Sequence, residues 1–219
     1  MELSTTTQAK RALRKTIEAK LKQLSQDVVM ESSVKIASKL LQRPEVSRAT
    51  CVSIYLAMPQ EANTNALVEG LFKEKKRLFV PKVVGKASDD MKMPEIKSEA
   101  ELGSLKKSKW GIPEFSLEQL QGRPDGLETE ECLVDLVLVP GVAFTPGCQR
   151  LGHGKGYYDC FLAKLQAARA ARQLCPAKVI GIALDEQIVD EVPLSPHDVA
   201  LDSIMTPTRV FEKPTTSEV

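Results

Sequence analysis

The sequence predicts an α/β protein of a single domain, residues 1–219, built on a mostly parallel, doubly wound (Rossmann-like) sheet with helices on both faces. Three observations favour this class. Short apolar runs alternate with segments of helical periodicity along most of the chain. The most apolar run, LVDLVLVPG at 133–141, has the composition of a central parallel strand buried on both sides. The chain of 219 residues, 42% of them hydrophobic, is long enough to bury one sizeable core.

The N-terminal segment TTTQAKRALRKTIEAKLKQL is basic and amphipathic. Its apolar residues recur at helical spacing: Leu13, Ile17, Leu21 and Leu24. We expect a helix capped by the threonines at 5–7, and a second helix that begins at Ser25. The same pattern is typical of a mitochondrial transit peptide, an alternative that Glu2 and Glu18 weaken.

The pattern of residues 51–83 predicts a βαβ unit. Strands are expected at 51–57 and 77–83, with a helix at 65–75 between them. The pattern then becomes irregular over 85–131, apart from a short helix near 98–103. We interpret 85–131 as an insertion that contributes to a substrate site, and not as a separate domain.

The second half continues the alternation after the central strand. A helix is predicted at 157–172, a strand at 178–184 and a short last strand at 203–206. The carboxyl ends of parallel strands gather ligands, so the residues after each strand become site candidates. Met58 and Glu61 follow the first strand and reach this edge of the sheet. The expected site has an apolar side and a cationic side.

Composition restricts the partners and the compartment. The net charge of +1 lacks the excess of positive charge that is typical of nucleic-acid-binding proteins, so we expect a small-molecule ligand. No apolar run approaches the ~20 residues that span a bilayer, so no membrane association is expected. The five cysteines include no CxxC pair and are odd in number, which indicates neither a zinc site nor a disulfide framework. A reducing compartment and a cytoplasmic location follow as expectations, with the mitochondrion as the alternative.

The stretch RLGHGKGYYD at 150–159 carries three alternating glycines among cations and tyrosines. It is not a phosphate-loop NTPase motif, because Gln149 and Gly156 stand where that motif needs Gly and Ser or Thr. It is not the dinucleotide fingerprint either, because Tyr157 replaces the third glycine. Such a loop exposes successive N–H groups and suits a phosphate. A glycine-rich connection before a helix is the alternative. Lys10 and Arg14, one helical turn apart, could present two further cations.

A resemblance to a known family rests on five pieces that occur in the family's order along the chain: KRALR, SIYLAMPQE, KWGIPE, VPGVAF with RLGHGKGYYD, and HDVALDSIMTP. In these pieces the sequence resembles the 5-formyltetrahydrofolate cyclo-ligases, also called methenyltetrahydrofolate synthetases. The resemblance covers nearly the whole chain. It implies a small α/β enzyme, expected as a monomer, that uses ATP and Mg²⁺. The reaction closes 5-formyltetrahydrofolate, with or without a polyglutamate tail, into 5,10-methenyltetrahydrofolate and releases ADP and phosphate.

The resemblance also implies roles for single residues. ATP binding falls to Lys10, Arg11, Arg14, Arg150, Leu151, Gly152, His153, Gly154, Lys155, Gly156, Tyr157 and Tyr158. Folate binding falls to Leu56, Met58, Glu61, Trp110, His153, Gly154, Lys155, Gly156 and Tyr157. Lys155 and Arg150 are the expected catalytic cations, with Lys155 nearest the transferred phosphoryl group. Mg²⁺ ligands are Asp159 and Asp198, hard oxygen donors that suit this ion.

Alternatives remain open at several of these positions. Asp159 could serve only as an acidic residue at a helix N-terminus, Asp202 competes with Asp198 for the metal, and Trp110 could be a core residue. His153 departs from the family pattern, where Arg or Tyr is expected, so its role stays open. At the level of function, the alternative is a non-catalytic or isomerase-type α/β module that binds a phosphorylated metabolite.

Overall fold

The computed structural model describes residues 5–129, 132–196 and 198–214. The helices are α1 (Thr5–Leu21), α2 (Gln26–Leu41), α3 (Pro44–Arg48), α4 (Asn65–Lys73), α5 (Glu99–Ser104) and α6 (Tyr157–Ala171), with 3₁₀ turns η1 (Glu118–Leu120) and η2 (Asp185–Gln187). The main sheet contains β1 (Cys51–Ile54), β2 (Arg77–Phe79), β5 (Glu95–Ile96), β6 (Leu136–Val139), β9 (Lys178–Ile182), β10 (Ser203–Met205) and β11 (Val210–Glu212). Two small ribbons pair β3 (Lys82–Val83) with β4 (Met91–Lys92), and β7 (Ala143–Phe144) with β8 (Arg150–Leu151).

The seven strands of the main sheet lie in the order β11-β10-β9-β6-β1-β2-β5. The inner neighbours from β10 to β2 pair in parallel, whereas β11 and β5 are antiparallel edge strands. The prediction of a mostly parallel sheet is therefore confirmed. The apolar run predicted as the central strand is β6, which lies in the middle of the sheet and is buried throughout.

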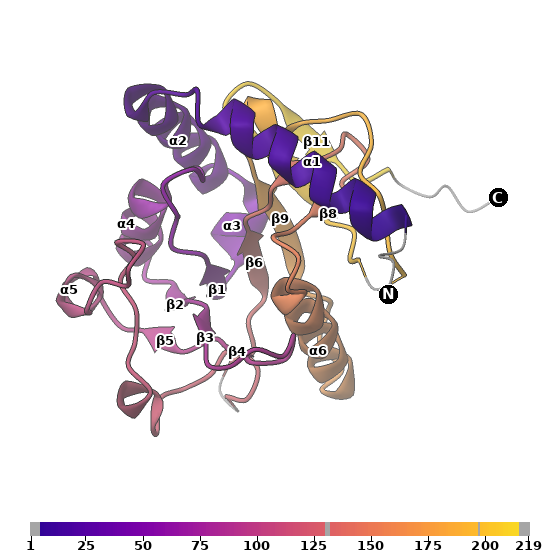
Figure 1. Ribbon diagram of the computed structural model, residues 1–219. Coiled ribbons are helices and arrows are strands. Elements are labelled where there is room, and N and C mark those ends of the chain that lie inside the picture. Colours follow the sequence, from indigo (N-terminus) through magenta and orange to yellow (C-terminus); the bar gives the residue numbers. More distant parts are fainter. Residues whose placement is uncertain (1–4, 130–131, 197, 215–219) are drawn as a thin grey trace.

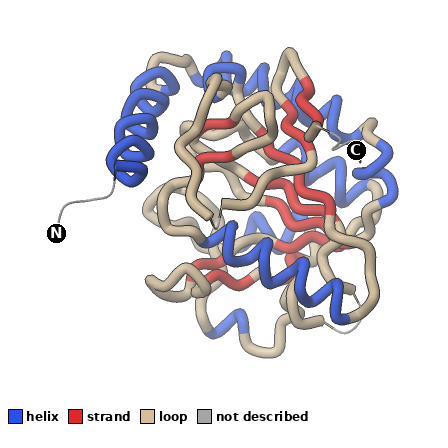
Figure 2. Tube along the Cα trace, turned by 90° about the vertical axis from the view of Figure 1, so that its right-hand side faces the viewer, coloured by secondary structure: helices blue, strands red, loops and turns tan. Residues whose placement is uncertain are grey.

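Alternate residues of β6 face two separate hydrophobic clusters, one on each side of the sheet. Leu136 and Leu138 join the cluster to which α1, α2, α3 and α4 contribute. Val137 and Val139 join the other, where α6 contributes Phe161. Figure 1 shows α2 and α4 on one side of the sheet and α6 on the other, and Figure 2 shows the strands side by side in the middle of the molecule. The predicted helix layers on both faces are confirmed.

Several predicted boundaries need correction. The predicted strand 77–83 is split: β2 ends at Phe79, and β3 belongs to a separate ribbon. Pro81, which has no N–H to donate to a ladder, stands between them. The threonines at 5–7 lie inside α1, so the predicted cap there is wrong. Ser25 does cap α2, because its hydroxyl accepts the N–H of Val28 at 3.3 Å.

The segment 85–131 is an excursion whose described residues stay attached to the main sheet. It contributes β5, which pairs with β2 at the sheet edge, and the short helix α5 close to its predicted position. Arg123 fastens it internally, because its guanidinium donates to the carboxylate of Glu101 and lies over the ring of Phe115. These contacts agree with the prediction that the segment is no separate domain.

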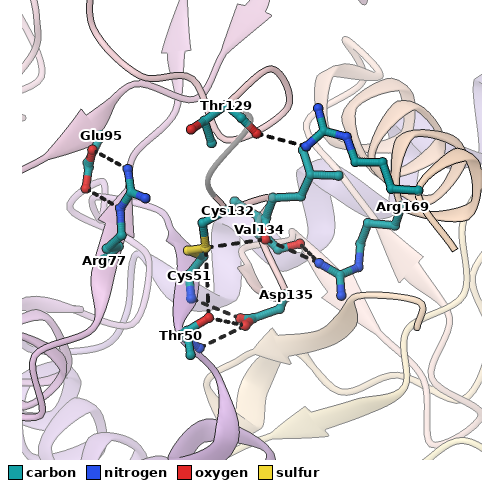
Figure 3. Close-up of a disulfide and its surroundings, with 11 residues drawn as sticks. Thr50, Cys51, Arg77, Glu95, Thr129, Cys132, Val134, Asp135 and Arg169 are labelled. Atoms are coloured by element: carbon teal, nitrogen blue, oxygen red, sulfur yellow. Dashed lines mark hydrogen bonds and ion pairs between the residues drawn. A yellow bond between two sulfur atoms is a disulfide. The ribbon is translucent and has the colours of Figure 1, made fainter. Parts of the chain in front are cut away.

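The structure corrects the expectation that no cysteines pair. Cys51 at the start of β1 and Cys132 shortly before β6 form a disulfide, with Cα atoms 6.5 Å apart (Figure 3). Their separation of 81 residues hides this proximity in the sequence, and only the pairing of β1 with β6 creates it. In Figure 3 the carboxylate of Asp135 binds the N–H groups of Thr50 and Cys51 beside the disulfide. Within the described part of the chain, no helix is long and apolar enough to cross a membrane.

Candidate functional site

The sheet topology itself defines the position of the site. Taken in chain order, the five parallel strands β1, β2, β6, β9 and β10 have the spatial order 2-1-3-4-5. The order therefore reverses between β1 and β6, and ligands of such folds bind at the carboxyl ends of the strands at this point. A cleft of about 870 Å³ opens there, with Tyr55 after β1 and Pro140 after β6 in its wall. This volume lies within the range of small-molecule sites.

The glycine loop forms one wall of the cleft, between β8 and α6. Gly154 and Gly156 have φ angles of +96° and +71°, a left-handed conformation that L side chains rarely adopt. A Cβ on Gly154 would also lie 3.2 Å from the guanidinium of Arg14. Gly156 leads directly into α6, whose first N–H groups have no partner within the helix. The N-terminal residues Tyr157 and Tyr158 line the cleft, so the loop and the helix end can accept an anion.

Helix α1 lines the cleft beside the glycine loop. Lys10 and Arg14 both line the cleft, as their spacing predicts. Arg14 donates from Nε to the carbonyl of Gly152 at 2.8 Å, and burial lowers the pKa of its guanidinium while Asp198 opposes that shift. Ile17 is buried in the core, so the segment is a helix of the folded protein. Arg11 is exposed and does not line the cleft.

The carboxylate of Asp159 belongs to the cleft and is already paired. Its Oδ1 accepts hydrogen bonds from Arg150 Nη2 at 2.9 Å and from the N–H of Val199 at 3.3 Å. Arg150 is only 3% exposed, and its Nη1 also donates to the carbonyl of Pro140. Its Nε is buried and has no hydrogen-bond partner among the described residues. Arg150 is thus fixed inside the wall behind Asp159.

The carboxylate of Asp198 is paired in the same manner. Its Oδ2 lies 2.5 Å from Lys10 Nζ and accepts the N–H of Ser195 at 2.7 Å. Lys10 also donates to the hydroxyl of Ser195 at 2.9 Å. Asp202, the competing candidate, binds Lys178 and the N–H of Val179 and does not line the cleft.

The two aspartates of the cleft could hold a metal only with additional ligands. The structure shows no group of three or more His, Cys, Asp or Glu, within the residues it describes, that could hold a metal ion. Every hydrogen bond to Asp159 or Asp198 among these residues falls on one oxygen of each. Mg²⁺ is commonly bound by one or two carboxylates together with phosphate oxygens and water, so this donor set fits Mg²⁺ when phosphates are present.

Glu61 occupies the other end of the cleft and is 8% exposed. Its Oε2 accepts the N–H of Met58 at 2.8 Å, and its Oε1 lies 3.3 Å from His153 Nε2. His153 thus approaches Glu61 across the cleft. Burial, together with the charge of Glu61, raises the pKa of Tyr55 and of Tyr158 well above the usual value, so both remain hydroxyl donors. The Tyr158 hydroxyl is buried and has no partner among the described residues.

A tight hairpin from the segment 85–131 overhangs the cleft. The N–H of Ser108 donates to the carbonyl of Ile112 at 2.8 Å, and Gly111 turns the chain with a φ of +77°. Trp110, next to that turn, is 60% exposed and stacks with Lys109, whose Nζ lies 5.2 Å from its ring centroid. The alternative that Trp110 is a core residue is therefore wrong.

The cleft gathers every predicted site residue except Arg11: Lys10, Arg14, Leu56, Met58, Glu61, Trp110, Asp198 and the whole run from Arg150 to Asp159 line it. Other lining residues were not predicted as site residues: Thr7, Tyr55, Pro81, Val83, Met91, Ser108, Lys109, Ile112, Pro113, Glu114, Pro140 and Ser195. Thr7 could have been found from its helical spacing to Lys10 and Arg14. Ser195 and Glu114 lie in irregular segments that give no such signal.

Comparison with known proteins gives relatives that cover nearly the whole chain. A Schizosaccharomyces pombe protein named "Probable 5-formyltetrahydrofolate cyclo-ligase" is 36% identical over 206 residues, covering 92% of this chain and 97% of its own. The 5-formyltetrahydrofolate cyclo-ligase of Mus musculus is 29% identical, covering 94% and 97%. A relative from Arabidopsis thaliana, named as mitochondrial, is 28% identical over 95% of this chain and 78% of its own.

Solved structures agree in fold. The NMR structure of Aquifex aeolicus 5,10-methenyltetrahydrofolate synthetase superimposes with a TM-score of 0.71 at 27% identity, covering 96% of this chain and 95% of the other. The synthetase of Mycoplasma pneumoniae gives a TM-score of 0.62, also at 27% identity, covering 90% and 98%. The sequence pattern that defines one family matches residues 6–207, a range that contains every cleft-lining residue. The chain belongs to the 5-formyltetrahydrofolate cyclo-ligase family.

Proposed function

We propose that this protein is an ATP- and Mg²⁺-dependent 5-formyltetrahydrofolate cyclo-ligase, which forms 5,10-methenyltetrahydrofolate and releases ADP and phosphate. The observation that carries the proposal is the composition of one cleft. A glycine loop, the cations of α1, two carboxylates and an apolar shelf around Glu61 all line it. Family membership supports the same activity.

The chemistry needs this combination because a formamide carbon is a poor electrophile and its oxygen is a poor leaving group. ATP, when bound, supplies the phosphoryl group that converts this oxygen into a leaving group before N10 of the folate closes the ring. The residues must then hold two ligands in line and stabilise the charge of the transferred group. A side-chain nucleophile is not required for this chemistry.

Phosphate binding falls to the glycine loop and to the cations that approach it. Lys155 is exposed and makes no hydrogen bond or ion pair with the described residues, so its ammonium is free to meet a phosphate. The terminal nitrogens of Arg14 lie within 3.3 Å of the position of a Cβ on Gly154, directly over the loop. Both cations can stabilise negative charge that develops on the transferred group, and in this role electrostatic stabilisation is the main catalytic effect.

Folate binding falls to the end of the cleft that contains Glu61. Its carboxylate can accept hydrogen bonds from the amino and ring N–H groups of the pterin, and it is the buried charged acceptor at that end. Leu56, Met58, Tyr157 and the exposed Trp110 supply apolar and aromatic surface for the flat rings of the ligand. Asp159 and Asp198 would hold Mg²⁺ together with phosphate oxygens of the nucleotide.

The proposal is tested by mixing the purified protein with 5-formyltetrahydrofolate and Mg·ATP and following the absorbance of methenyltetrahydrofolate. We expect an absorbance rise that requires both ATP and Mg²⁺, with one ADP released for each ring closed. Omission of ATP is the control, and an equal rate without ATP would contradict the proposal. ATP turnover without ring closure would show that the protein catalyses a different reaction.

A further inference from the structure

The two aspartates of the cleft, Asp159 and Asp198, are each paired with a cation on the proposed phosphate side of the site. Lys10 Nζ lies 2.5 Å from Asp198 Oδ2, and Arg150 Nη2 lies 2.9 Å from Asp159 Oδ1. Lys10 is only 13% exposed, so this pair is partly shielded from water. A metal ion that enters the free cleft therefore finds a cation on each of these two aspartates.

The two pairs differ in how easily they can open. Arg150 is almost fully buried, and the carbonyl of Pro140 binds it as well, so it stays behind Asp159. Lys10 stands on α1 at the cleft wall, with a flexible side chain that contacts Ser195 and Asp198. The pair between Lys10 and Asp198 is thus the one that a ligand can exchange.

A divalent cation alone cannot open this pair at low cost. It would have to expel a cation from a shielded carboxylate and leave the Lys10 ammonium without a partner in the same cleft, which is unfavourable. It would also remain short of ligands, because the described residues contain no group of three or more metal-binding side chains. A nucleotide changes both conditions, since its phosphate oxygens can accept Lys10 and complete the coordination of the metal.

On the basis of the proposed function, we infer that Lys10 closes the metal site in the free protein, so that divalent metal enters only together with the nucleotide. Binding exchanges partners: Lys10 moves from the carboxylate of Asp198 to a phosphate, and Asp198 moves from Lys10 to the metal. Arg14, which also acts on Asp198 through its charge, is already engaged with the carbonyl of Gly152 and stays in place. Lys10 is thus a positioning residue for the metal ligand as well as a phosphate ligand.

The test compares metal binding with and without nucleotide, independently of catalysis. Mn²⁺ serves as the spectroscopic probe for Mg²⁺, and its binding is measured by electron paramagnetic resonance on the full chain, with Mn²⁺ alone and with the Mn·ADP complex. We expect the wild type to bind Mn·ADP but to bind free Mn²⁺ at least about tenfold more weakly than Lys10→Met does. Mn·ADP should bind Lys10→Met more weakly than wild type, so the coupling between metal and nucleotide falls.

Lys155→Met is the matched control, because it removes the same charge from the same cleft without opening a carboxylate. We expect it to change the affinity for free Mn²⁺ by less than about threefold. Equal gains in both variants would show a general effect of cleft charge and would overturn the inference. So would a wild type that binds free Mn²⁺ as tightly as Lys10→Met, or a Lys10→Met protein that shows no gain.

Further measurements distinguish a failure of this inference from misfolding of a variant and from a failure of the proposed function. Circular dichroism checks each variant, and Lys10→Gln repeats the measurement with a polar side chain if the Met variant fails to fold. If Lys10→Met gains Mn²⁺ affinity but the wild type never closes the folate ring, the closure of the metal site stands and the proposed function fails. If the ring closes but the Mn²⁺ affinities are equal, the inference fails alone.

Discussion

At the scale of single residues, the cations of the cleft fall into two groups. Lys10 and Arg150 each form an ion pair with a carboxylate, whereas Lys155 has no such pair with the described residues. We therefore expect the two groups to have different roles. In the proposed reaction, a paired cation would hold the site together before ligands bind, and an unpaired one would stabilise the charge that develops on the transferred group.

Replacement of Lys155 by alanine should therefore affect the reaction and not the binding of folate. We expect kcat to fall by about 10²-fold or more, because one stabilising cation is lost from the transition state. The dissociation constant for 5-formyltetrahydrofolate should stay within about threefold of wild type. Trp110, the single tryptophan of the chain, lines the cleft, so quenching of its fluorescence can report folate binding. Unchanged turnover would remove Lys155 from the site.

Glu61→Gln should have the opposite effect. The amide retains the shape of the side chain but presents a donor where pterin donors and the N–H of Met58 need an acceptor. We expect folate binding to weaken by ~1–3 kcal/mol, about 5- to 150-fold, with ATP affinity nearly constant. Separate titrations with folate and with a non-hydrolysable ATP analogue measure this. A loss of ATP affinity alone would show that the pterin binds elsewhere.

Single residues were predictable where they belong to a motif with a known chemical requirement. The loop Arg150–Asp159 combines glycines and cations, as phosphate binding requires, and all of its residues line the cleft. Burial and partners were not predictable. The sequence predicts Arg150 as a phosphate ligand, yet its side chain is buried behind Asp159 in the wall of the cleft. The contact of His153 with Glu61 joins two strand ends far apart in sequence.

At the scale of elements, helix α1 provides the cationic wall of the cleft. Its faces have different roles: Ile17 and Leu21 are buried, Lys10 and Arg14 line the cleft, and Lys15 is exposed. Because the cleft residues lie in the first two-thirds of the helix, the anchoring residues can remain when the N-terminal turns are removed.

Removal of residues 1–14 should abolish ATP-dependent ring closure and leave the protein folded. Thermal unfolding by circular dichroism should remain cooperative, since Ile17 and Leu21 still cover the core. The double variant Lys10→Ala with Arg14→Ala should behave like the deletion. Lys15→Ala with Lys20→Ala, two exposed lysines of the same helix outside the cleft, is the matched control and should retain activity. Full activity of the deletion would remove α1 from the site.

The start of β1 and the approach to β6 are joined by the disulfide of Cys51 and Cys132, a contact between elements (Figure 3). Cys148, Cys160 and Cys175 are free. Protein unfolded in guanidinium without a reductant should therefore react with iodoacetamide at three cysteines, and at five after reduction. Mass spectrometry of the alkylated peptides counts them. Five modified cysteines without reduction would contradict the disulfide.

The main elements were predictable because local pattern decides them. The run that forms β6 and the periodicity of α1, α4 and α6 are strong signals of apolar burial. The edge strands β5 and β11 were missed. Each has two or three residues, and its pairing depends on a neighbour brought in by the rest of the chain. The disulfide was missed for the same reason.

At the scale of the whole molecule, the reversal of strand order between β1 and β6 explains why distant segments share one site. The chain continues from β1 to α4 on one face of the sheet and from β6 towards α6 on the other, and α1, the glycine loop and the hairpin that contains Trp110 line the cleft at this point. In the proposed function, the phosphates and the folate would share this one cleft of about 870 Å³. The proposed reaction requires the phosphoryl group of ATP to reach the formyl oxygen of the folate in this cleft.

An isotope measurement shows whether the phosphoryl group is transferred to the formyl oxygen. The substrate is prepared with ¹⁸O in its formyl group, and the phosphate released in one turnover is analysed by mass spectrometry. If the γ-phosphoryl group is transferred to the formyl oxygen, a P–O bond forms there and the C–O bond breaks when N10 closes the ring. We therefore predict that the label appears in inorganic phosphate and not in ADP. Unlabelled phosphate, with the label in water, would contradict phosphoryl transfer at this site even if the ring closes.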